Sequence, residues 1–429
     1  MIASELELTR KNYYHLGVPR EREHAQLAGE QTADVCVVGG GFAGLSAAMD
    51  LADRGYKVIV LEGEQIGWGA SGRNGGQSLA GLACDNSVVE KVAGFETAKH
   101  AWDISIEALD LVRSRIKQYN IDCDYVDGYL SLAVNQRKSN ELKKWYDDIQ
   151  TRYGYKYVQW IDPQNVEQWI ASNRFHSGVL DTNSGHLHPR KYLFGIEKAA
   201  LEKGVMIHEH THAVRVEQGA RPRVVTANGA VTCDFVVLAG NVYLADTMPQ
   251  VSARIMPVGT YIVGTQSLGK ERADSLIKNR VAVCDTNFIL DYFRVVADHR
   301  LLFGGRVSYS TMTPLNMAQS MKQRILAVFP QLSDADIEFA WGGFVDITMN
   351  RAPDFGRIGN NMYYLQGFSG HGLALTGMAG KLAAEAIVGQ AERFDWFSKI
   401  PHHNFPGGKL LRTPMLVMAM AYYRLRDLV

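Results

Sequence analysis

Residues 35–62 read VCVVGGGFAGLSAAMDLADRGYKVIVLE and decide the fold. The apolar run 35–38 is typical of a strand buried on both faces. The glycine turn 39–44 contains G-x-G-x-x-G, and the amphipathic helix that follows ends before Gly55. A second apolar strand, 58–61, leads to an acid at Glu62. This order of elements predicts a dinucleotide-binding βαβ unit.

The residues of this unit have mechanical roles. Gly39 permits the tight turn, Gly41 lets the backbone approach a pyrophosphate, and Gly44 lets the helix pack on the strand. The pyrophosphate would sit at the positive N-terminus of the helix, and Glu62 is placed to accept hydrogen bonds from ribose hydroxyls. The predicted cofactor-binding residues here are Gly39, Gly41, Phe42, Ala43, Gly44 and Glu62.

A second glycine-rich loop follows at residues 67–77, GWGASGRNGGQ. An NAD dehydrogenase would proceed directly to its next helix and strand, whereas this loop offers backbone N–H groups and polar side chains to a longer ligand. The alternative is a flexible surface loop. The candidate cofactor-binding residues of the loop are Gly69, Ala70, Ser71, Arg73, Asn74, Gly75, Gly76 and Gln77.

Residues 362–372, MYYLQGFSGHG, repeat the order of strand and glycine turn, and a helix rich in Ala, Gly and Leu runs on to about Val388. A helix start aimed at a flavin would stabilise negative charge that builds up on reduction. His371 could add a hydrogen bond there, or it could instead cap the helix. Two distant glycine loops fit a ligand with two ends, FAD, better than NAD. The candidates in this loop are Gly370, His371 and Gly372.

The composition narrows the function classes. In the 429 residues, 45 Lys and Arg balance 45 Asp and Glu, which argues against binding to nucleic acid or to a membrane surface. The 41 glycines exceed the roughly 30 that average usage gives, and many of the surplus lie in the three loops. Five scattered cysteines and a polar N-terminus predict a cytoplasmic protein with reduced thiols. The sequence indicates no oligomeric state.

These motifs resemble those of the D-amino-acid-oxidase superfamily of FAD amine oxidoreductases, and within it the gamma-glutamylputrescine oxidases. The resemblance extends over nearly the whole chain and includes IDCDYVDGYL (121–130), SGHLHP (184–189), VVLAGNVYL (236–244), RLLFGG (300–305) and AERFDWFSKIPHHNFPGG (391–408). It implies an α/β fold in which a Rossmann-like FAD-binding domain of the glutathione-reductase type is interleaved with an α+β substrate domain. The substrate domain would have a mixed or antiparallel sheet.

The order of the predicted elements along the chain also indicates interleaved domains. We assign 30–95, 175–250 and 345–429 to the FAD-binding domain, 96–174 and 251–344 to the substrate domain, and 1–29 to an N-terminal extension. Strands are predicted at 125–134, 256–264, 288–296 and 301–307, and helices at 97–119, 137–153 and 190–202.

The resemblance also implies cofactor contacts later in the chain: backbone near Val214 for the adenine, and Ala239, Gly240 and Asn241 for the flavin. Asn241 could instead be a turn residue. In the related sarcosine-oxidase branch a cysteine before the third glycine loop is linked to the flavin. No cysteine follows Cys284 here, so we predict noncovalent FAD.

The activity that the resemblance implies is oxidation of a primary amine, gamma-glutamylputrescine or a related polyamine derivative. Hydride would pass to flavin N5, water would hydrolyse the imine to an aldehyde and ammonia, and oxygen would accept the electrons and give hydrogen peroxide. Sarcosine oxidases carry a lysine that grips the substrate carboxylate where this chain has Ala374. The alternatives are an amino-acid or N-methyl-amino-acid oxidase or dehydrogenase, and a non-catalytic flavin-binding subunit or sensor.

Aromatic side chains could surround an aliphatic amine through cation–π and apolar contact. The candidate catalytic residues are His371, Tyr292 and Trp341, and the candidate substrate residues are Tyr261, Phe293 and Arg306. For each aromatic residue the alternative is core packing, and for Arg306 it is surface ion pairing.

Two groups of histidines suggest other roles. His208, His210 and His212 alternate, so on a strand they would share a face as metal ligands can, but no fourth ligand is apparent and we predict no metal. His186 and His188 precede Pro189, the first residue of a predicted helix. We interpret them as helix caps, with a place near the flavin as the alternative.

Overall fold

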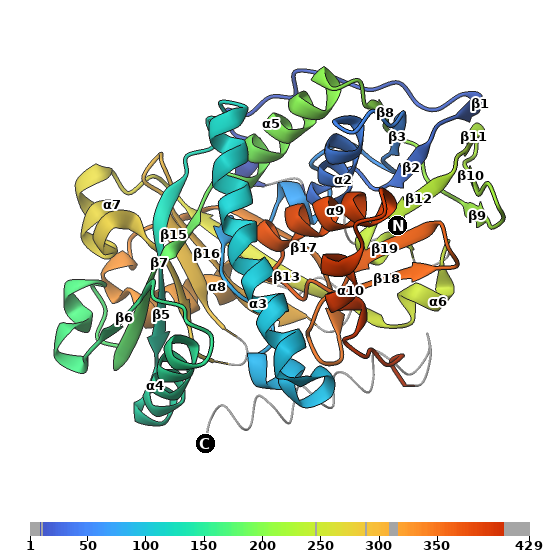
Figure 1. Ribbon diagram of the computed structural model, residues 1–429. Helices are drawn as coiled ribbons and strands as arrows, with labels where there is room; N and C mark the ends of the chain where they lie inside the picture. Colours follow the sequence, from blue (N-terminus) through green and yellow to red (C-terminus); the bar gives the residue numbers. More distant parts are fainter. Residues whose placement is uncertain (1–8, 10–11, 245–246, 288–289, 309–315, 407–429) are drawn as a thin grey trace.

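The computed structural model describes residues 9, 12–244, 247–287, 290–308 and 316–406, without the side chains of 306–308. The described strands form three sheets. In Figure 1 the strands of the mostly parallel sheet lie at the upper right and many of those of the largest sheet lie at the left.

The mostly parallel sheet contains the predicted βαβ unit. All neighbouring strands run parallel except β18 and β19. The four residues of β2 and the four of β3 are all buried, as the apolar runs predict. In order the strands are β18 (Asp354–Ile358), β19 (Met362–Gln366), β12 (Phe235–Leu238), β2 (Val35–Val38), β3 (Val58–Leu61) and β8 (Met206–His208).

Helices pack against this sheet and against one another to form the largest apolar core. The helices α2 and α9 approach so closely that a Cβ at Gly380 would lie 2.2 Å from the carbonyl oxygen of Ala43. The glycines and alanines of α9 therefore permit the contact between the two helices. The helices of this part are α2 (Phe42–Ala52), α3 (Asn86–Gln118), α5 (Pro189–Glu202), α9 (Leu373–Ile387) and α10 (Glu392–Ser398).

The largest sheet is mixed: its strands pair antiparallel except for β5 with β14. In order they are β17 (Ile337–Thr348), β13 (Ile255–Thr265), β16 (Leu301–Ser308), β15 (Tyr292–Val295), β14 (Ala282–Asp285), β5 (Val126–Ala133), β7 (Ser177–His186) and β4 (Gln77–Ser78), and β6 (Val158–Ile161) also pairs with β7. Among the described helices, those that pack with this sheet include α4 (Gln136–Thr151), α7 (Lys270–Leu276) and α8 (Met317–Val328).

A small sheet lies beside the parallel one. Its strands are β1 (Gly29–Thr32), β11 (Gly229–Thr232), β10 (Arg223–Val225) and β9 (Arg215–Glu217), and the short helix α6 (Pro249–Ser252) follows β12 along the chain. The mixture of parallel and antiparallel sheets with packed helices confirms the predicted α/β fold.

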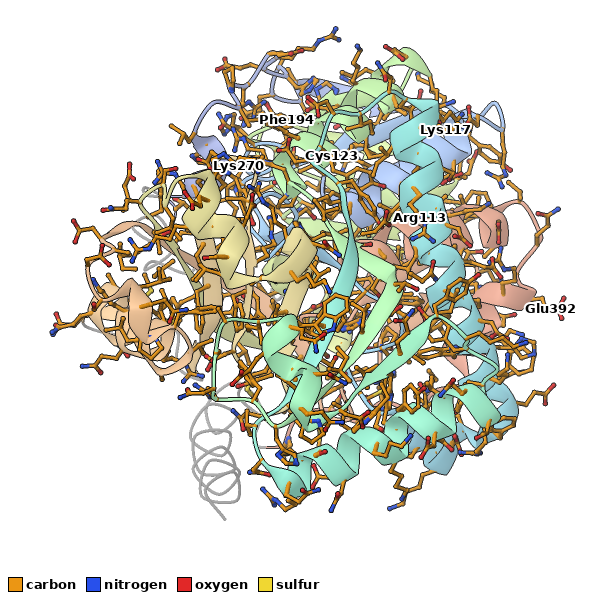
Figure 2. The ribbon with its side chains drawn as sticks, turned by 90° about the vertical axis from the view of Figure 1, so that its left-hand side faces the viewer. Arg113, Lys117, Cys123, Phe194, Lys270 and Glu392 are labelled. Carbon is orange, nitrogen blue, oxygen red and sulfur yellow. The ribbon has the colours of Figure 1, made fainter. Side chains whose placement is uncertain are left out.

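The predicted strands and helices are present, with two differences in length. The strand expected over 288–296 is β15, which spans Tyr292–Val295, and residues 288 and 289 lie outside the described residues. The helix expected over 97–119 begins at Asn86, because the Asp85 side chain accepts from the Ser87 N–H and caps it, and the helix is interrupted at Gly94, where φ is 85°. Farther along α3, Arg113 (Figure 2) donates to the Asn183 backbone carbonyl at 2.7 Å and ties the helix to β7 of the mixed sheet.

The division into FAD-binding and substrate domains stays a prediction. The strand β7, inside the segment 175–250, pairs with β5 from the segment 96–174, so the mixed sheet joins segments assigned to both domains. Among the described helices, none has the length and apolar character that crossing a membrane requires.

Candidate functional site

A cavity of about 900 Å³ lies where the glycine loops meet the mixed sheet. This volume is within the usual range for small-molecule sites. The loops line it through Gly41, Phe42, Ala43, Ala70, Ser71, Arg73, Asn74, Gly75, Gln77, Ala239, Asn241, Gly370, His371 and Gly372. Most of the predicted cofactor-binding residues therefore surround one space, although they come from four separate parts of the chain.

The first glycine turn requires residues without a side chain. Gly39 has φ of 108°, and a Cβ there would lie 2.5 Å from the carbonyl oxygen of Ala239. A Cβ at Gly44 would lie 1.9 Å from the oxygen of Gly39. The helix α2 starts directly after this turn and faces the cavity with Phe42 and Ala43. Backbone N–H groups of a helix start are thus presented to a ligand, as anion binding requires.

Glu62 follows β3 and is held beside the same turn. Its carboxylate accepts from the N–H of Gly40 at 2.8 Å and from the N–H of Glu64 at 2.9 Å. Burial raises the pKa of Glu62, and the two backbone N–H groups oppose that rise. Glu62 is not among the described residues that line the cavity, so its contact with a ribose stays a prediction.

The second glycine loop has a fixed shape rather than that of a free surface loop. The Asn74 amide donates to the carbonyls of Ala70 and Ser71, at 3.0 and 3.1 Å, and its oxygen accepts from Gly76 N–H at 2.8 Å. The Ser71 hydroxyl accepts from Phe42 N–H at 3.0 Å and so joins this loop to the start of α2. Asn74 therefore shapes the loop.

Arg73 belongs to the wall of the cavity. It is 3% exposed, its guanidinium lies 4.7 Å from the ring centre of Trp68, and it donates to the hydroxyl of Tyr243 at 3.2 Å. The carbonyl of Arg73 accepts from the indole N–H of Trp341 at 2.9 Å. The remaining predicted residues of the loop, Gly69 and Gly76, are not among the described residues that line the cavity.

The third glycine loop places a second helix start at the cavity. The helix α9 begins at Leu373, and Gly372 precedes it without any side-chain hydrogen bond, so His371 does not cap the helix. His371 lines the cavity and its Nε2 lies 3.0 Å from the carbonyl oxygen of Ala80. Burial lowers the pKa of His371, which keeps the imidazole neutral at pH 7.

Asp346 is a buried carboxylate of the cavity that the sequence did not single out. It lies on β17, is 3% exposed, and accepts from Gly367 N–H at 2.6 Å. Burial raises its pKa to about 7, against hydrogen bonds from backbone N–H groups that lower it. Asp346 therefore holds the third glycine loop against the mixed sheet. Its local sequence, FVDIT, gives no signal of this role.

Two cysteines, Cys84 and Cys284, also line the cavity, and the sequence did not predict this either. Burial raises the pKa of Cys84 to about 12 and raises that of Cys284 still further above its usual value. Both thiols are therefore protonated at neutral pH, a state that is a poor nucleophile.

Of the aromatic candidates, Tyr292 alone lines the cavity within the described residues, and its ring lies over Gly304 and beside Gly75. Phe293, the next residue of β15, points to the opposite face of the sheet and stacks on Phe303 in the core. Its assignment to the substrate site is wrong, because adjacent residues of a strand face opposite sides.

Tyr261 and Trp341 are also core residues, 1% and 0% exposed. Neither is among the described residues that line the cavity. Trp341 acts on the cavity wall indirectly through its hydrogen bond to Arg73. Their contact with substrate stays a prediction, and their neighbours Thr260, Ile262 and Gly342 line the cavity. The side chain of Arg306 lies outside the described part of the structure.

Of the four cofactor candidates between residues 214 and 241, two are among the described residues that line the cavity and two are not. Ala239 and Asn241 line the cavity, whereas a Cβ at Gly240 would meet Leu244 at 2.7 Å, away from it. Asn241 has φ of 53° and accepts from Val242 N–H, which is the turn role weighed for it. Val214 is 54% exposed, and its N–H donates to Val225 at the small sheet, so its contact with adenine stays a prediction.

The pair His186 and His188 and the triplet His208, His210 and His212 do not form a metal site in the described structure. His208 ends β8 and His210 has φ of 51°, so the three alternating histidines do not form one strand face. Within the described residues no group of three or more His, Cys, Asp or Glu side chains could hold a metal. His188 caps α5 by accepting from Lys191 N–H, as interpreted, while His186 lies on β7 and contacts Arg294 at 3.0 Å.

Comparisons with known proteins agree with this site. The family model for "FAD dependent oxidoreductase" (DAO) matches residues 34–386. Gamma-glutamylputrescine oxidoreductase of Escherichia coli K12 is 40% identical over 417 residues, 97% of this chain and 98% of that protein. A probable oxidoreductase, OrdL, of Haemophilus influenzae is 39% identical over 97% of each chain.

A likeness in structure extends to more distant proteins. Glycine oxidase from Geobacillus kaustophilus superposes with a TM-score of 0.72 at 19% identity, covering 83% of this chain and 95% of that one. At this identity the likeness shows the fold alone. The fold is therefore that of known FAD-dependent oxidases.

Proposed function

The chain belongs to the DAO family of FAD dependent oxidoreductases, and from that premise we propose that it is an FAD-dependent amine oxidase. Its proposed substrate is gamma-glutamylputrescine or a related polyamine derivative. The observation that carries the proposal is the 40% identity to gamma-glutamylputrescine oxidoreductase over 97% of the chain. The cavity of about 900 Å³ that the glycine loops line supports it further.

The residues of the cavity fit FAD. The first turn, where Gly39 and Gly44 leave no room for a Cβ, would hold the pyrophosphate at the start of α2. The second loop and the start of α9 would hold the rest of the cofactor along the same cavity. When bound, FAD supplies the acceptor for the hydride that leaves the carbon next to the amine.

The protein residues must bind the amine and keep it neutral. A primary amine has a pKa near 10.4, like lysine, so removal from water at the cavity has to favour its uncharged form. Tyr292 offers an aromatic wall beside the second loop. Ala374 is buried in the core of α9 and gives no cation to hold an α-carboxylate near the reacting carbon.

Two charged residues of the cavity lining suit the glutamyl group of the proposed substrate. Asp85 and Arg351 both line the cavity and carry opposite charges, and Met349, which also lines it, is 53% exposed. A glutamyl group carries an ammonium and a carboxylate that match this pair. The reacting amine would then lie beside Tyr292, which lines the same cavity.

The proposed overall reaction is balanced with oxygen as the electron acceptor. The amine, oxygen and water give an aldehyde, ammonia and hydrogen peroxide. The two carbon-bound electrons reduce oxygen, and water replaces nitrogen when the imine is hydrolysed. We further propose that FAD is bound noncovalently, because the Cys84 and Cys284 thiols are held protonated. The five free cysteines suit the reducing cytoplasm.

A substrate panel tests this function. The FAD-loaded protein is mixed with gamma-glutamylputrescine, putrescine, sarcosine and glycine, and peroxide, aldehyde and ammonia are measured together. We expect equal amounts of the three products, with the highest kcat/KM for gamma-glutamylputrescine. Preference for sarcosine or glycine would instead identify an amino-acid oxidase. Absence of product with every amine, while FAD stays bound, would favour a non-catalytic flavoprotein.

A further inference from the structure

Arg294 is a buried cation directly behind the second glycine loop. It lies on β15, two residues after Tyr292, and is 3% exposed. Its guanidinium donates to the carbonyl of Gly75 at 2.8 Å, to Nδ1 of His186 at 3.0 Å and to the hydroxyl of Tyr14 at 3.0 Å. Three separate parts of the chain therefore fix the position of this charge.

The partners of Arg294 are neutral. Burial, and then the charge of Arg294 itself, lower the pKa of His186 to about 3. Because Nδ1 of His186 accepts from Arg294, its Nε2 carries the hydrogen and donates to the carbonyl of Arg280 at 2.7 Å. Burial also raises the pKa of Tyr14, so its hydroxyl stays protonated.

Arg294 lacks a carboxylate partner in the part of the chain that the structure describes. A buried charge without an opposite charge is costly, and most buried guanidinium groups are paired. By contrast, Arg300, which directly precedes the neighbouring strand β16, binds the carboxylates of Asp298 and Glu338. The charge of Arg294 is therefore available to an anion at the cavity.

The guanidinium faces the cavity through the backbone of the loop. A Cβ at Gly76 would lie 2.5 Å from Nη2 of Arg294, so the group packs directly on the loop. Gly75 both accepts from Arg294 and lines the cavity. Between the charge and the cavity there is thus one layer of backbone, which screens a charge far less than water does.

We propose that Arg294 is a positioning residue that stabilises the negative charge FAD gains on reduction, and so raises the reduction midpoint potential of the bound cofactor. The inference rests on FAD binding and not on the identity of the amine. Ser71 marks the start of α2, where the pyrophosphate would bind. Gly75 lies farther along the loop, next to Tyr292, so the charge acts on the redox-active end.

The proposal is tested by the midpoint potential, measured by equilibrating the FAD-loaded protein with a reference dye. Arg294→Gln keeps a hydrogen-bonding side chain and removes the charge. We expect it to shift the equilibrium between oxidised and reduced FAD at least tenfold toward the oxidised form, about 30 mV for a two-electron couple. Arg294→Lys retains the charge and should restore most of the shift.

A second pair of variants keeps Arg294 in place. Tyr14→Glu sets a carboxylate beside the guanidinium and cancels its field, so we expect the same direction of shift as for Arg294→Gln. Tyr14→Phe removes only a hydrogen bond and should leave the potential unchanged while it lowers thermal stability. Arg300→Gln is the matched control, because Arg300 is already paired with carboxylates, and it should leave the potential unchanged.

Two results would overturn the proposal. One is a shift of less than threefold in the equilibrium between oxidised and reduced FAD, in both Arg294→Gln and Tyr14→Glu. The other is a tenfold loss of affinity for oxidised FAD in these variants with an unchanged potential, since the charge would then serve the phosphates. Neither result depends on amine turnover, so failure of the proposed substrate would be seen separately.

Discussion

Arg351 lines the cavity and has a left-handed backbone conformation, with φ of 61°. Few residues other than glycine, asparagine and aspartate adopt this conformation, so the turn holds the backbone of Arg351 in an energetically unfavourable conformation. Its N–H donates to the carbonyl of Thr348 at 3.1 Å, which fixes the turn at the end of β17. We propose that this side chain meets the carboxylate of the glutamyl group.

Replacing Arg351 by Gln tests that contact. A hydrogen bond to a charged group contributes about 1.5–3 kcal/mol, so we expect KM for gamma-glutamylputrescine to rise about tenfold or more, with little change in kcat. Putrescine lacks the carboxylate, and its KM should not change. Arg357→Gln is the control, because Arg357 pairs with Asp395 away from the cavity. Equal effects on both amines would contradict a role in reading the glutamyl group.

Phe293 and Tyr292 differ in role because they are neighbours on one strand. Phe293→Ala removes a side chain that packs between Phe303 and Phe329, and should lower the free energy of unfolding by roughly 3–5 kcal/mol. KM of the folded enzyme should stay within twofold. Urea unfolding and steady-state kinetics measure the two effects, and a large rise in KM at unchanged stability would return Phe293 to the substrate site.

Sequence reasoning could place these aromatic residues on strands but could not choose their faces. Strand β15 reads YFRV, and three of its four residues are buried, so no alternation of apolar and polar residues marks the side toward the cavity. The same holds for Trp341 and Tyr261 on two long, largely buried strands. Glycine turns were easier to predict, because the tight turn and the close approach of the backbone need glycine at fixed positions in the sequence.

At the scale of elements, Asp346 connects β17 to the loop that starts α9. The unfolded carboxyl releases its proton near pH 3.9, whereas the folded one holds it until about pH 7. Between these values the folded state binds more protons than the unfolded state, so stability falls as pH rises. Above about pH 7 this contribution is constant.

Asp346→Asn should therefore change the pH dependence of stability. We expect the difference in apparent Tm, original protein minus variant, to decline from pH 4 to pH 7 and then to stay constant. The measurement is the apparent Tm of both proteins at each pH in low-salt buffer. Parallel Tm curves across that interval would show that Asp346 does not hold a proton in the folded state.

The elements themselves were largely predictable, and their ends less so. The βαβ unit, β13, β16 and α4 follow from apolar periodicity and glycine punctuation. The early start of α3 was missed because Asp85 is a cap residue before a stretch with little apolar pattern, and because Gly94 interrupts the helix. Local signals of this kind give element type more readily than element length.

For the molecule as a whole, the loops that line the cavity are separated by long stretches of chain, and bound FAD would bridge them. Ligand that binds only the folded state stabilises it by about 2.7 kcal/mol at a hundredfold excess over Kd. We expect added FAD to raise the Tm of the apoprotein in a concentration-dependent way. Acid precipitation should release all the flavin into the supernatant. Yellow colour that stays with the precipitated protein would contradict noncovalent binding.

What sequence reasoning could not supply at this scale is the meeting of distant segments. Arg294 meets Tyr14 and Gly75 across the whole fold, Asp346 meets Gly367, and Cys84 and Cys284 reach the same cavity. Each contact depends on how the mixed sheet packs against the glycine loops. Their residue types alone, a few charges and thiols among many, mark no site.

The most direct test of an FAD-dependent amine oxidase is anaerobic titration of the FAD-loaded protein with gamma-glutamylputrescine, followed by flavin absorbance. We predict that one equivalent of the amine removes the absorbance of oxidised flavin completely, and that admitting oxygen restores it with one equivalent of peroxide. A flavin that stays oxidised under excess amine without oxygen would contradict the account.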